Sequence, residues 1–109
     1  MIMVKRPEQV TDFDSSSIKK TESTVGSNVT LLDGKSLTLL CPSNGNPKPT
    51  ITWYKEGVPV TMGERISFGS ANELTIENLK VDDAAVYTCV ADNGRGRDKV
   101  SSLVNVVGS

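Results

Sequence analysis

The chain contains no histidine and only two cysteines in its 109 residues. Histidine is the commonest general base in catalysis and the commonest metal ligand, so its absence excludes Ser-His and Cys-His catalytic pairs and His-containing zinc sites. Aromatic residues are scarce, at 5% of the sequence. Long apolar runs are also missing, since nothing approaches the roughly 18 consecutive residues of a membrane-spanning helix. We therefore expect no metal, no cofactor and no insertion of this segment into a membrane.

The charged residues balance each other, because 12 Lys and Arg stand against 13 Asp and Glu and leave a net charge of −1. Nucleic-acid-binding domains usually carry a net positive footprint, so nucleic acid is not an expected partner. An apolar content of 37% and a charged content of 23% are typical of a soluble globular domain. The length fits one such domain.

The chain changes character near residue 25. Residues 1–24 are rich in Ser, Thr, Asp, Glu and Lys, and their few apolar residues follow no period, which predicts a flexible linker with room for one short edge strand. From Val25 onward, short runs rich in Val, Ile, Thr and Leu alternate with turn pairs such as Asp33-Gly34 and Asn93-Gly94. About seven such strands, with turns roughly every 8–12 residues, are typical of an all-β sandwich. We place the domain at 25–107 and a tail at 108–109.

Alternation along each run predicts which side chains face the core of the sandwich. The inward positions are Leu37, Leu39, Cys41, Ile51, Trp53, Leu74, Ile76, Tyr87, Cys89, Ala91, Val100, Ser102, Val104 and Val106. Both cysteines fall on inner faces. On this pattern alone, each Cys remains a candidate nucleophile, metal ligand, redox sensor or half of a disulfide.

The two cysteines belong to a wider pattern. Cys41, Trp53 and Cys89 occur in that order, with Tyr87 two residues before the second Cys. The segments DDAAVYTC and GNPKPTITWYKEG fit the patterns D-x-A-x-Y-x-C and G-x-P-x-P-x-I-x-W-x-K-x-G of immunoglobulin domains, so the sequence over about 25–107 resembles that family. The resemblance implies an immunoglobulin-like β-sandwich of two antiparallel sheets joined by a Cys41–Cys89 disulfide. It also implies that Trp53 packs on the disulfide and that Tyr87 forms a tyrosine corner.

The span between Trp53 and Leu74 is short, which resembles the intermediate (I-set) type of immunoglobulin domain. Leu74 itself is one of the predicted core residues. In such domains an Arg that opens the fourth strand commonly pairs with the Asp six residues before the second Cys. The resemblance therefore implies an ion pair between Arg65 and Asp83.

The disulfide is also favoured on physical grounds. A bond between Cys41 and Cys89 would close a loop of about 49 residues. Closing this loop removes entropy from the unfolded chain, which gives roughly 4 kcal/mol of stabilisation. Buried free thiols in a cytosolic domain are the alternative. A catalytic cysteine is not favoured, because no histidine or other evident base could activate it.

Two surface motifs are candidates for modification or binding. Asn28-Val29-Thr30 is the only N-x-S/T triplet, which makes Asn28 a candidate glycan acceptor in a secreted protein, although such triplets also arise by chance. Arg95, Arg97 and Lys99 occupy alternate positions and form a candidate basic stripe for heparan sulfate or an acidic partner. Neighbouring acidic residues dilute this charge, so an ordinary solvated strand is the favoured interpretation.

Apolar side chains on the outside of the sheet form a third candidate. If Trp53 and Cys89 point inward, the outward positions of the same sheet include Tyr54, Val86, Val90, Leu103 and Val107. A contiguous group of exposed apolar residues can mark an interface. Ordinary β-propensity on a solvated sheet is the alternative.

The resemblance implies a non-enzymatic immunoglobulin module of an extracellular matrix or cell-surface protein, serving recognition, adhesion or spacing. Its partner would be another protein, a neighbouring module or, weakly, a second copy. An enzyme is not expected, since this composition offers neither an evident base nor a pocket.

Two other functions stay open. One is a structural I-set spacer in a cytosolic muscle or cytoskeletal protein of the titin type. The other is a ligand-binding domain of a growth-factor receptor, because CPSNGNPKPTITWYKEG is similar to the start of the second immunoglobulin domain of fibroblast-growth-factor receptors. The basic heparin-binding cluster of those domains is not evident, since the only basic pair noted before the strand that leads to Cys41 is Lys19-Lys20.

Overall fold

The computed structural model describes residues 3–4 and 21–108. Every regular element among these residues is a strand, apart from the 3₁₀ helix η2 (Val81–Asp83). The strands, in chain order, are β1 (Met3–Val4), β2 (Thr21–Thr24), β3 (Val29–Leu32), β4 (Leu37–Leu40), β5 (Ser43–Asn44), β6 (Thr50–Lys55), β7 (Val58–Pro59), β8 (Ile66–Phe68), β9 (Leu74–Ile76), β10 (Ala85–Asp92) and β11 (Arg97–Val107).

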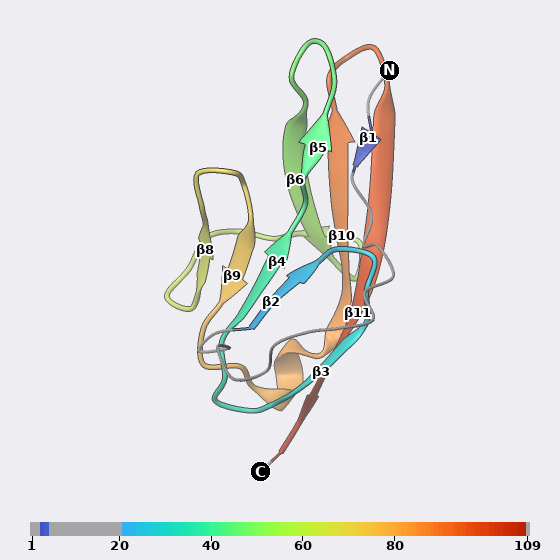
Figure 1. Cartoon of the computed structure of the whole chain (residues 1–109). Coiled ribbons are helices and arrows are strands. Elements are labelled where there is room, and N and C mark those ends of the chain that lie inside the picture. The colour runs from blue at the N-terminus through green and yellow to red at the C-terminus, as the bar shows by residue number, and fades with distance from the viewer. Residues whose placement is uncertain (1–2, 5–20, 109) are drawn as a thin grey trace.

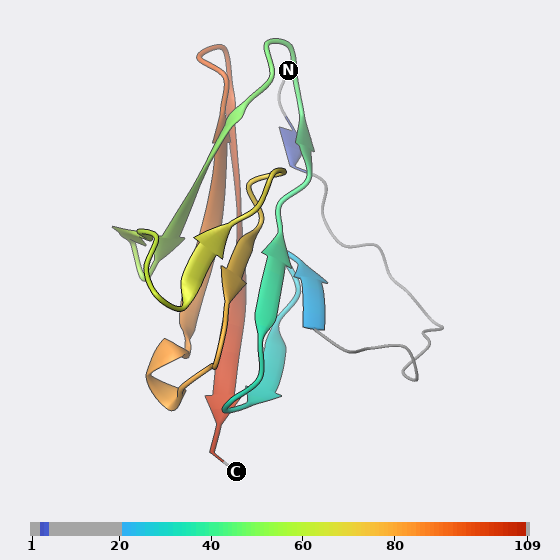
Figure 2. The same cartoon turned by 90° about the vertical axis from the view of Figure 1, so that its left-hand side faces the viewer.

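Two main sheets form a sandwich, which confirms the predicted fold class (Figure 1). The larger sheet has the strand order β3-β11-β10-β6-β7, and the smaller has β2-β4-β9-β8. Figure 2 turns the smaller sheet toward the viewer, with β8 and β9 in front of the larger sheet.

The prediction that both sheets are purely antiparallel is wrong, because β3 runs parallel to β11 and β2 runs parallel to β4. Only strands joined by a tight hairpin must be antiparallel. Neither of these two pairs is joined in that way, so the pairing direction is free to differ.

Two short strands also precede the predicted start of the domain at residue 25. Strand β2 pairs with β4, and Val4 of β1 is only 1% exposed and belongs to the core. Val4 is the register partner of Ser43 in β5, and its backbone N–H donates to Asp98 Oδ2 at 2.9 Å. The sandwich therefore includes two strands from the predicted linker. The rest of that linker, residues 1–2 and 5–20, lies outside the described residues, as does Ser109 of the predicted tail.

The core lies between the two sheets and is built from alternate positions of their strands. Its buried apolar members are Val4, Val25, Leu37, Leu39, Cys41, Trp53, Leu74, Ile76, Leu79, Ala85, Tyr87, Cys89, Ala91, Val104 and Val106. Each predicted inward position is buried or packs against these residues. Ser102 is the one polar residue among them, and its hydroxyl accepts a hydrogen bond from the Gly26 N–H at 2.7 Å.

Two hairpins set the register of the larger sheet. Between β6 and β7, Glu56 and Gly57 form a two-residue turn in which both φ angles are positive, at 50° and 82°. Between β10 and β11, a four-residue loop at 93–96 places Asp92 opposite Arg97. The outward side chains of β6, β10 and β11 consequently line up in rows across the sheet.

Candidate functional site

The two cysteines form the disulfide that the resemblance implied. Cys41 follows β4 and Cys89 lies in β10, so the bond joins the two sheets, with a Cα–Cα distance of 6.4 Å. Trp53 is the cross-strand neighbour of Cys89 and is buried with it. No free cysteine occurs among residues 3–4 and 21–108. Cys89 is therefore part of the scaffold and not a reactive thiol.

Tyr87 closes a corner between β10 and η2. Its hydroxyl donates a hydrogen bond to the backbone oxygen of Asp83 at 2.7 Å, and its ring is buried. Burial, together with the nearby Asp83 charge, raises the pKa of Tyr87 to about 12. The hydroxyl therefore stays protonated and able to donate at neutral pH.

The implied pair of Arg65 and Asp83 is also present in the structure. Arg65 Nη1 lies 2.8 Å from Asp83 Oδ2, and Nη2 lies 3.2 Å from Oδ1, so the contact is bidentate. The backbone N–H of Lys80 donates to the same carboxylate at 2.8 Å. Burial acts to raise the pKa of Asp83, but the hydrogen bonds from Arg65 and Lys80 and the nearby positive charges outweigh it, so this pKa lies below its ordinary value of 3.8. Both groups are satisfied within the domain and are not available to a ligand.

The outer surface of the larger sheet carries the candidate partner face. On β10, Val86, Thr88 and Val90 point outward and alternate with the buried Tyr87 and Cys89. The register pairs each of them with an outward residue of β11. These pairs are Val86 with Leu103, Thr88 with Ser101, and Val90 with Lys99. Tyr54 of β6 stands opposite Thr88 on the other side. We call this surface the outer face.

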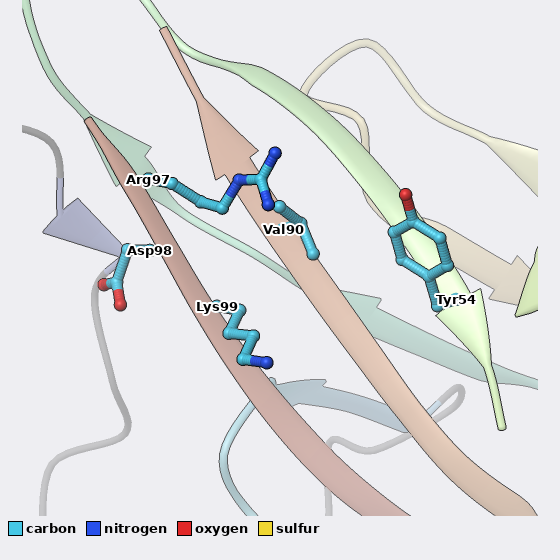
Figure 3. A pocket seen from close by; sticks show the side chains of 5 residues that line it. All are labelled: Tyr54, Val90, Arg97, Asp98 and Lys99. Carbon is cyan, nitrogen blue, oxygen red and sulfur yellow. The ribbon is translucent and has the colours of Figure 1, made fainter. Parts of the chain in front are cut away.

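A hollow of about 400 Å³ lies on the outer face near the β10–β11 hairpin. Tyr54, Val90, Arg97, Asp98 and Lys99 line it, and we call it the outer pocket (Figure 3). Figure 3 shows Tyr54, Val90 and Arg97 projecting from three adjacent strands, whereas Asp98 points away toward β1. The outer pocket thus combines an aromatic ring, an aliphatic side chain and two cations.

The two cations of the outer pocket differ in what they contact. Arg97 Nη2 lies 3.2 Å from Asp92 Oδ2 in an exposed ion pair. The Gly94 N–H and the Arg97 side chain both hydrogen-bond the Asp92 carboxylate and lower its pKa. Lys99 has no ion pair or hydrogen bond from its ammonium group within the described part of the chain. Its charge is therefore available to a partner.

The candidate basic stripe is only partly continuous. Arg97 and Lys99 both face the outer pocket, but Arg95 lies in the hairpin loop at 93–96, outside it. Heparan sulfate needs several aligned cations, and one of these two is already paired with Asp92. The arrangement suits a compact anionic group better than a polyanion.

The other end of the outer face is apolar. Leu103 and Val86 are 48% and 38% exposed, and they are direct cross-strand neighbours. Leu32 and Val107 form a second exposed pair between β3 and β11. The hydroxyls of Thr88 and Ser101 hydrogen-bond each other at 2.8 Å between the outer pocket and the Val86–Leu103 pair. The candidate partner face is therefore divided into two parts.

Asn28 lies at the edge of the apolar part. Its side-chain Oδ1 accepts a hydrogen bond from the Leu103 N–H at 3.0 Å. The parallel ladder between β3 and β11 begins one residue further on, at Val29 and Val104. The side chain of Asn28 thus extends that ladder by one bond, a contact that sequence spacing alone gives no sign of. Whether Asn28 carries a glycan stays a prediction.

A second hollow, of about 270 Å³, lies beside β6 and β8, which belong to different sheets. Its lining is Ile51, Thr52, Trp53, Val60, Phe68 and Asn72. Trp53 Nε1 donates to the backbone oxygen of Asn72 at 2.7 Å, which fixes the indole at its base. The lining contains no ionisable side chain, so it offers no general acid or base.

Within residues 3–4 and 21–108, no cluster of His, Cys, Asp or Glu has the composition to hold a metal ion. The same residues include no helix long and apolar enough to cross a membrane. Of these two hollows, the outer pocket is the one in which cations meet an aromatic and an aliphatic side chain.

Comparison with known proteins agrees with the immunoglobulin-like fold. The family model for the immunoglobulin I-set domain matches residues 20–106. A vascular endothelial growth factor receptor kdr-like protein of Danio rerio is 45% identical over 73 residues, which cover 67% of this chain and 6% of that protein. Hemicentin-1 of Mus musculus is 43% identical over 72 residues, or 65% of this chain and 1% of that protein. Neural cell adhesion molecule 1 of Rattus norvegicus is 37% identical over 84 residues, or 72% and 10%.

Solved structures show the same fold. A titin M10–obscurin-like 1 Ig mutant complex matches with a TM-score of 0.73 and 28% identity, over 78% of this chain and 89% of that chain. The tandem Ig repeats of Dlar match with a TM-score of 0.71 and 30% identity, over 78% and 46%. The chain spans one tenth or less of the three curated relatives.

Proposed function

Because this chain belongs to the immunoglobulin I-set family, we propose that it is a non-enzymatic recognition module of an extracellular matrix or cell-surface protein, and that its outer face binds another protein. The family is shared by modules that bind partners and modules that only separate them. The choice between these roles depends on the surface of this particular chain.

The outer pocket is the observation that carries the proposal. Lys99 has no partner within the described residues, and Tyr54 and Val90 stand beside it in a hollow of about 400 Å³. An aromatic ring, an aliphatic side chain and a cation together suit a carboxylate that is flanked by an apolar side chain. The expected occupant is therefore a protein surface with an acidic residue next to an apolar one. A second copy of this chain is included among the candidates.

The disulfide and the relatives support an extracellular location. Disulfides persist in oxidising compartments and are rare in the cytosol. The relatives include proteins named as a receptor and as a cell adhesion molecule. These names describe other proteins, and they support the same general role for this chain.

A structural spacer in a cytosolic protein of the titin type is the second candidate. The match to the titin–obscurin-like 1 complex, at 28% identity, favours it. This role requires both cysteines to be free thiols in the native protein. Mass analysis of protein from its native source, under non-reducing conditions with thiol alkylation, distinguishes the two: two alkylated cysteines support the spacer, and none supports the extracellular module.

Growth-factor binding is a third candidate, favoured by the 45% identity to the kdr-like receptor. Lys19-Lys20, the basic pair noted in the sequence, lies outside the described residues. Retention of the chain on a heparin–growth-factor column would support this role. Passage without retention would count against it.

The charge of Lys99 gives a direct test of the proposed recognition. Binding of the chain is measured to itself, by sedimentation, and to a panel of purified cell-surface ectodomains. Replacing Lys99 with Glu is expected to weaken binding to the partner so found by about 1–2 kcal/mol, or roughly five- to thirtyfold in Kd, because an attraction becomes a repulsion. The loss should shrink as salt is added.

Arg95→Glu is the matched control. It makes the same change of charge in the hairpin loop, outside the outer pocket. The proposal predicts that Arg95→Glu keeps most of the affinity. Equal losses in both variants would point to general charge attraction, and no loss in Lys99→Glu would contradict the proposed site.

A further inference from the structure

We propose that Asn28 carries an N-linked oligosaccharide, and that this glycan covers the Leu103 end of the outer face and leaves the outer pocket as its open part. The inference rests on the proposed extracellular location. It adds a modification site and a boundary to the binding surface.

The first support is the state of the Asn28 amide. Its Oδ1 accepts the hydrogen bond from the Leu103 N–H at 3.0 Å, and its Nδ2 makes no hydrogen bond within the described residues. N-linked glycans attach through Nδ2, so the bond that holds the side chain does not compete with the modification. A glycosylated Asn28 can keep the contact with Leu103 that it makes now.

The second support is the direction of the side chain. Asn28, Thr30 and Leu32 are exposed, whereas the intervening Val29 and Leu31 pack toward the core. Positions 28, 30 and 32 therefore share the outward side of the larger sheet, which is the side of Leu103 and Val86. Thr30, which completes the N-x-S/T triplet, has no side-chain hydrogen bond among the described residues.

The third support is what the glycan would cover. Leu103, at 48% exposed, is hydrogen-bonded through its own backbone to Asn28. The Val86–Leu103 pair would otherwise leave adjacent apolar side chains in water on a sheet. A bulky hydrated oligosaccharide anchored beside Leu103 shields that pair. The outer pocket lies beyond the Thr88–Ser101 hydrogen bond and stays accessible.

The covalent step needs a donor of one chemical class, an oligosaccharide linked through a diphosphate to a membrane lipid. Asn28 Nδ2 attacks C1 of the first sugar and forms an N–C bond. The C1–O bond to the diphosphate breaks, and its electron pair leaves with the lipid diphosphate. Nδ2 loses one proton, so the product is a neutral secondary amide and no oxidation or reduction occurs.

Expression of the full chain in animal cells, with an added secretion signal, tests the modification without depending on where the parent protein resides. The secreted wild type and Thr30→Ser are expected to carry a heterogeneous added mass that a peptide N-glycosidase removes. Thr30→Ala and Asn28→Asp are expected to lack it. Asn28→Asp keeps a side-chain oxygen for the Leu103 N–H, so a stable but unmodified protein separates loss of the glycan from loss of the fold. Secreted, folded wild type without the added mass would overturn the proposal.

The shielding is measured by the rate at which a maleimide labels Leu103→Cys, before and after the glycosidase. The proposal predicts labelling that is several-fold slower with the glycan in place. Lys99→Cys, in the outer pocket, should react at the same rate in both states. Equal rates at Leu103→Cys would overturn the shielding. The test of Lys99→Glu can be run on glycan-free protein, so failure here is distinct from failure of the recognition role.

Discussion

Replacing Trp53 with alanine is expected to lower the free energy of unfolding by about 3–5 kcal/mol, since this is the usual cost of removing a buried aromatic side chain and leaving a cavity. Trp53 is only 2% exposed and stands between the disulfide and the second hollow. Because Trp53 already borders the second hollow, few neighbouring side chains are placed to relax into the cavity that the indole would leave. The indole N–H bond to Asn72 is lost as well.

The measurement is urea denaturation followed by circular dichroism, since the only tryptophan is removed. Tyr54→Ala serves as the control, because Tyr54 is an aromatic residue of the same strand that points outward. Its loss of stability should be clearly smaller. A change below about 1 kcal/mol for Trp53→Ala would contradict the packing described here.

Removing the Cys41–Cys89 disulfide is expected to destabilise the domain by about 2–5 kcal/mol. The bond closes a loop between residues 48 apart in sequence and joins the two sheets. Without it, the unfolded chain regains the entropy that the loop withheld. That loss is a large share of the roughly 5–15 kcal/mol typical of a whole domain.

The comparison is between the wild type, oxidised and reduced, and the double variant Cys41→Ala with Cys89→Ala. Reduced wild type and the double variant should both unfold at lower denaturant concentration than the oxidised protein. Coincident transitions for all three would show that the bond contributes little. They would also remove one support for an extracellular role.

Local patterns predicted most of the scaffold. Alternation placed Leu37, Leu39 and Trp53 inward because one side of each long strand must be buried. The Cys-Trp-Cys order with Tyr87 added the disulfide and the corner, because these residues are fixed by a shared geometry. The inward positions follow from each strand by itself, whereas the disulfide was implied by the family resemblance, since its two cysteines lie 48 residues apart.

Long-range contacts outside the family pattern were not predicted. Strand β1 is two residues long and shows no period, so nothing in its sequence marks Val4 as part of the core. Lys99 and Tyr54 were named separately, but their meeting in one hollow follows from the registers of two strand pairs. The same holds for Asn28 and Leu103, which lie 75 residues apart and meet only through the β3–β11 ladder.

The central claim is that the outer face, and not the opposite sheet, binds the partner. The most direct test is the affinity of Val90→Lys for that partner, beside Ser67→Lys as the control. Val90 lines the outer pocket, whereas Ser67 is an exposed position of β8 on the other sheet. The account predicts a loss of about tenfold or more for Val90→Lys, because a lysine at an apolar contact forfeits more than about 1.4 kcal/mol, and little change for Ser67→Lys. With both variants folded to similar stability, undiminished binding by Val90→Lys would contradict the account.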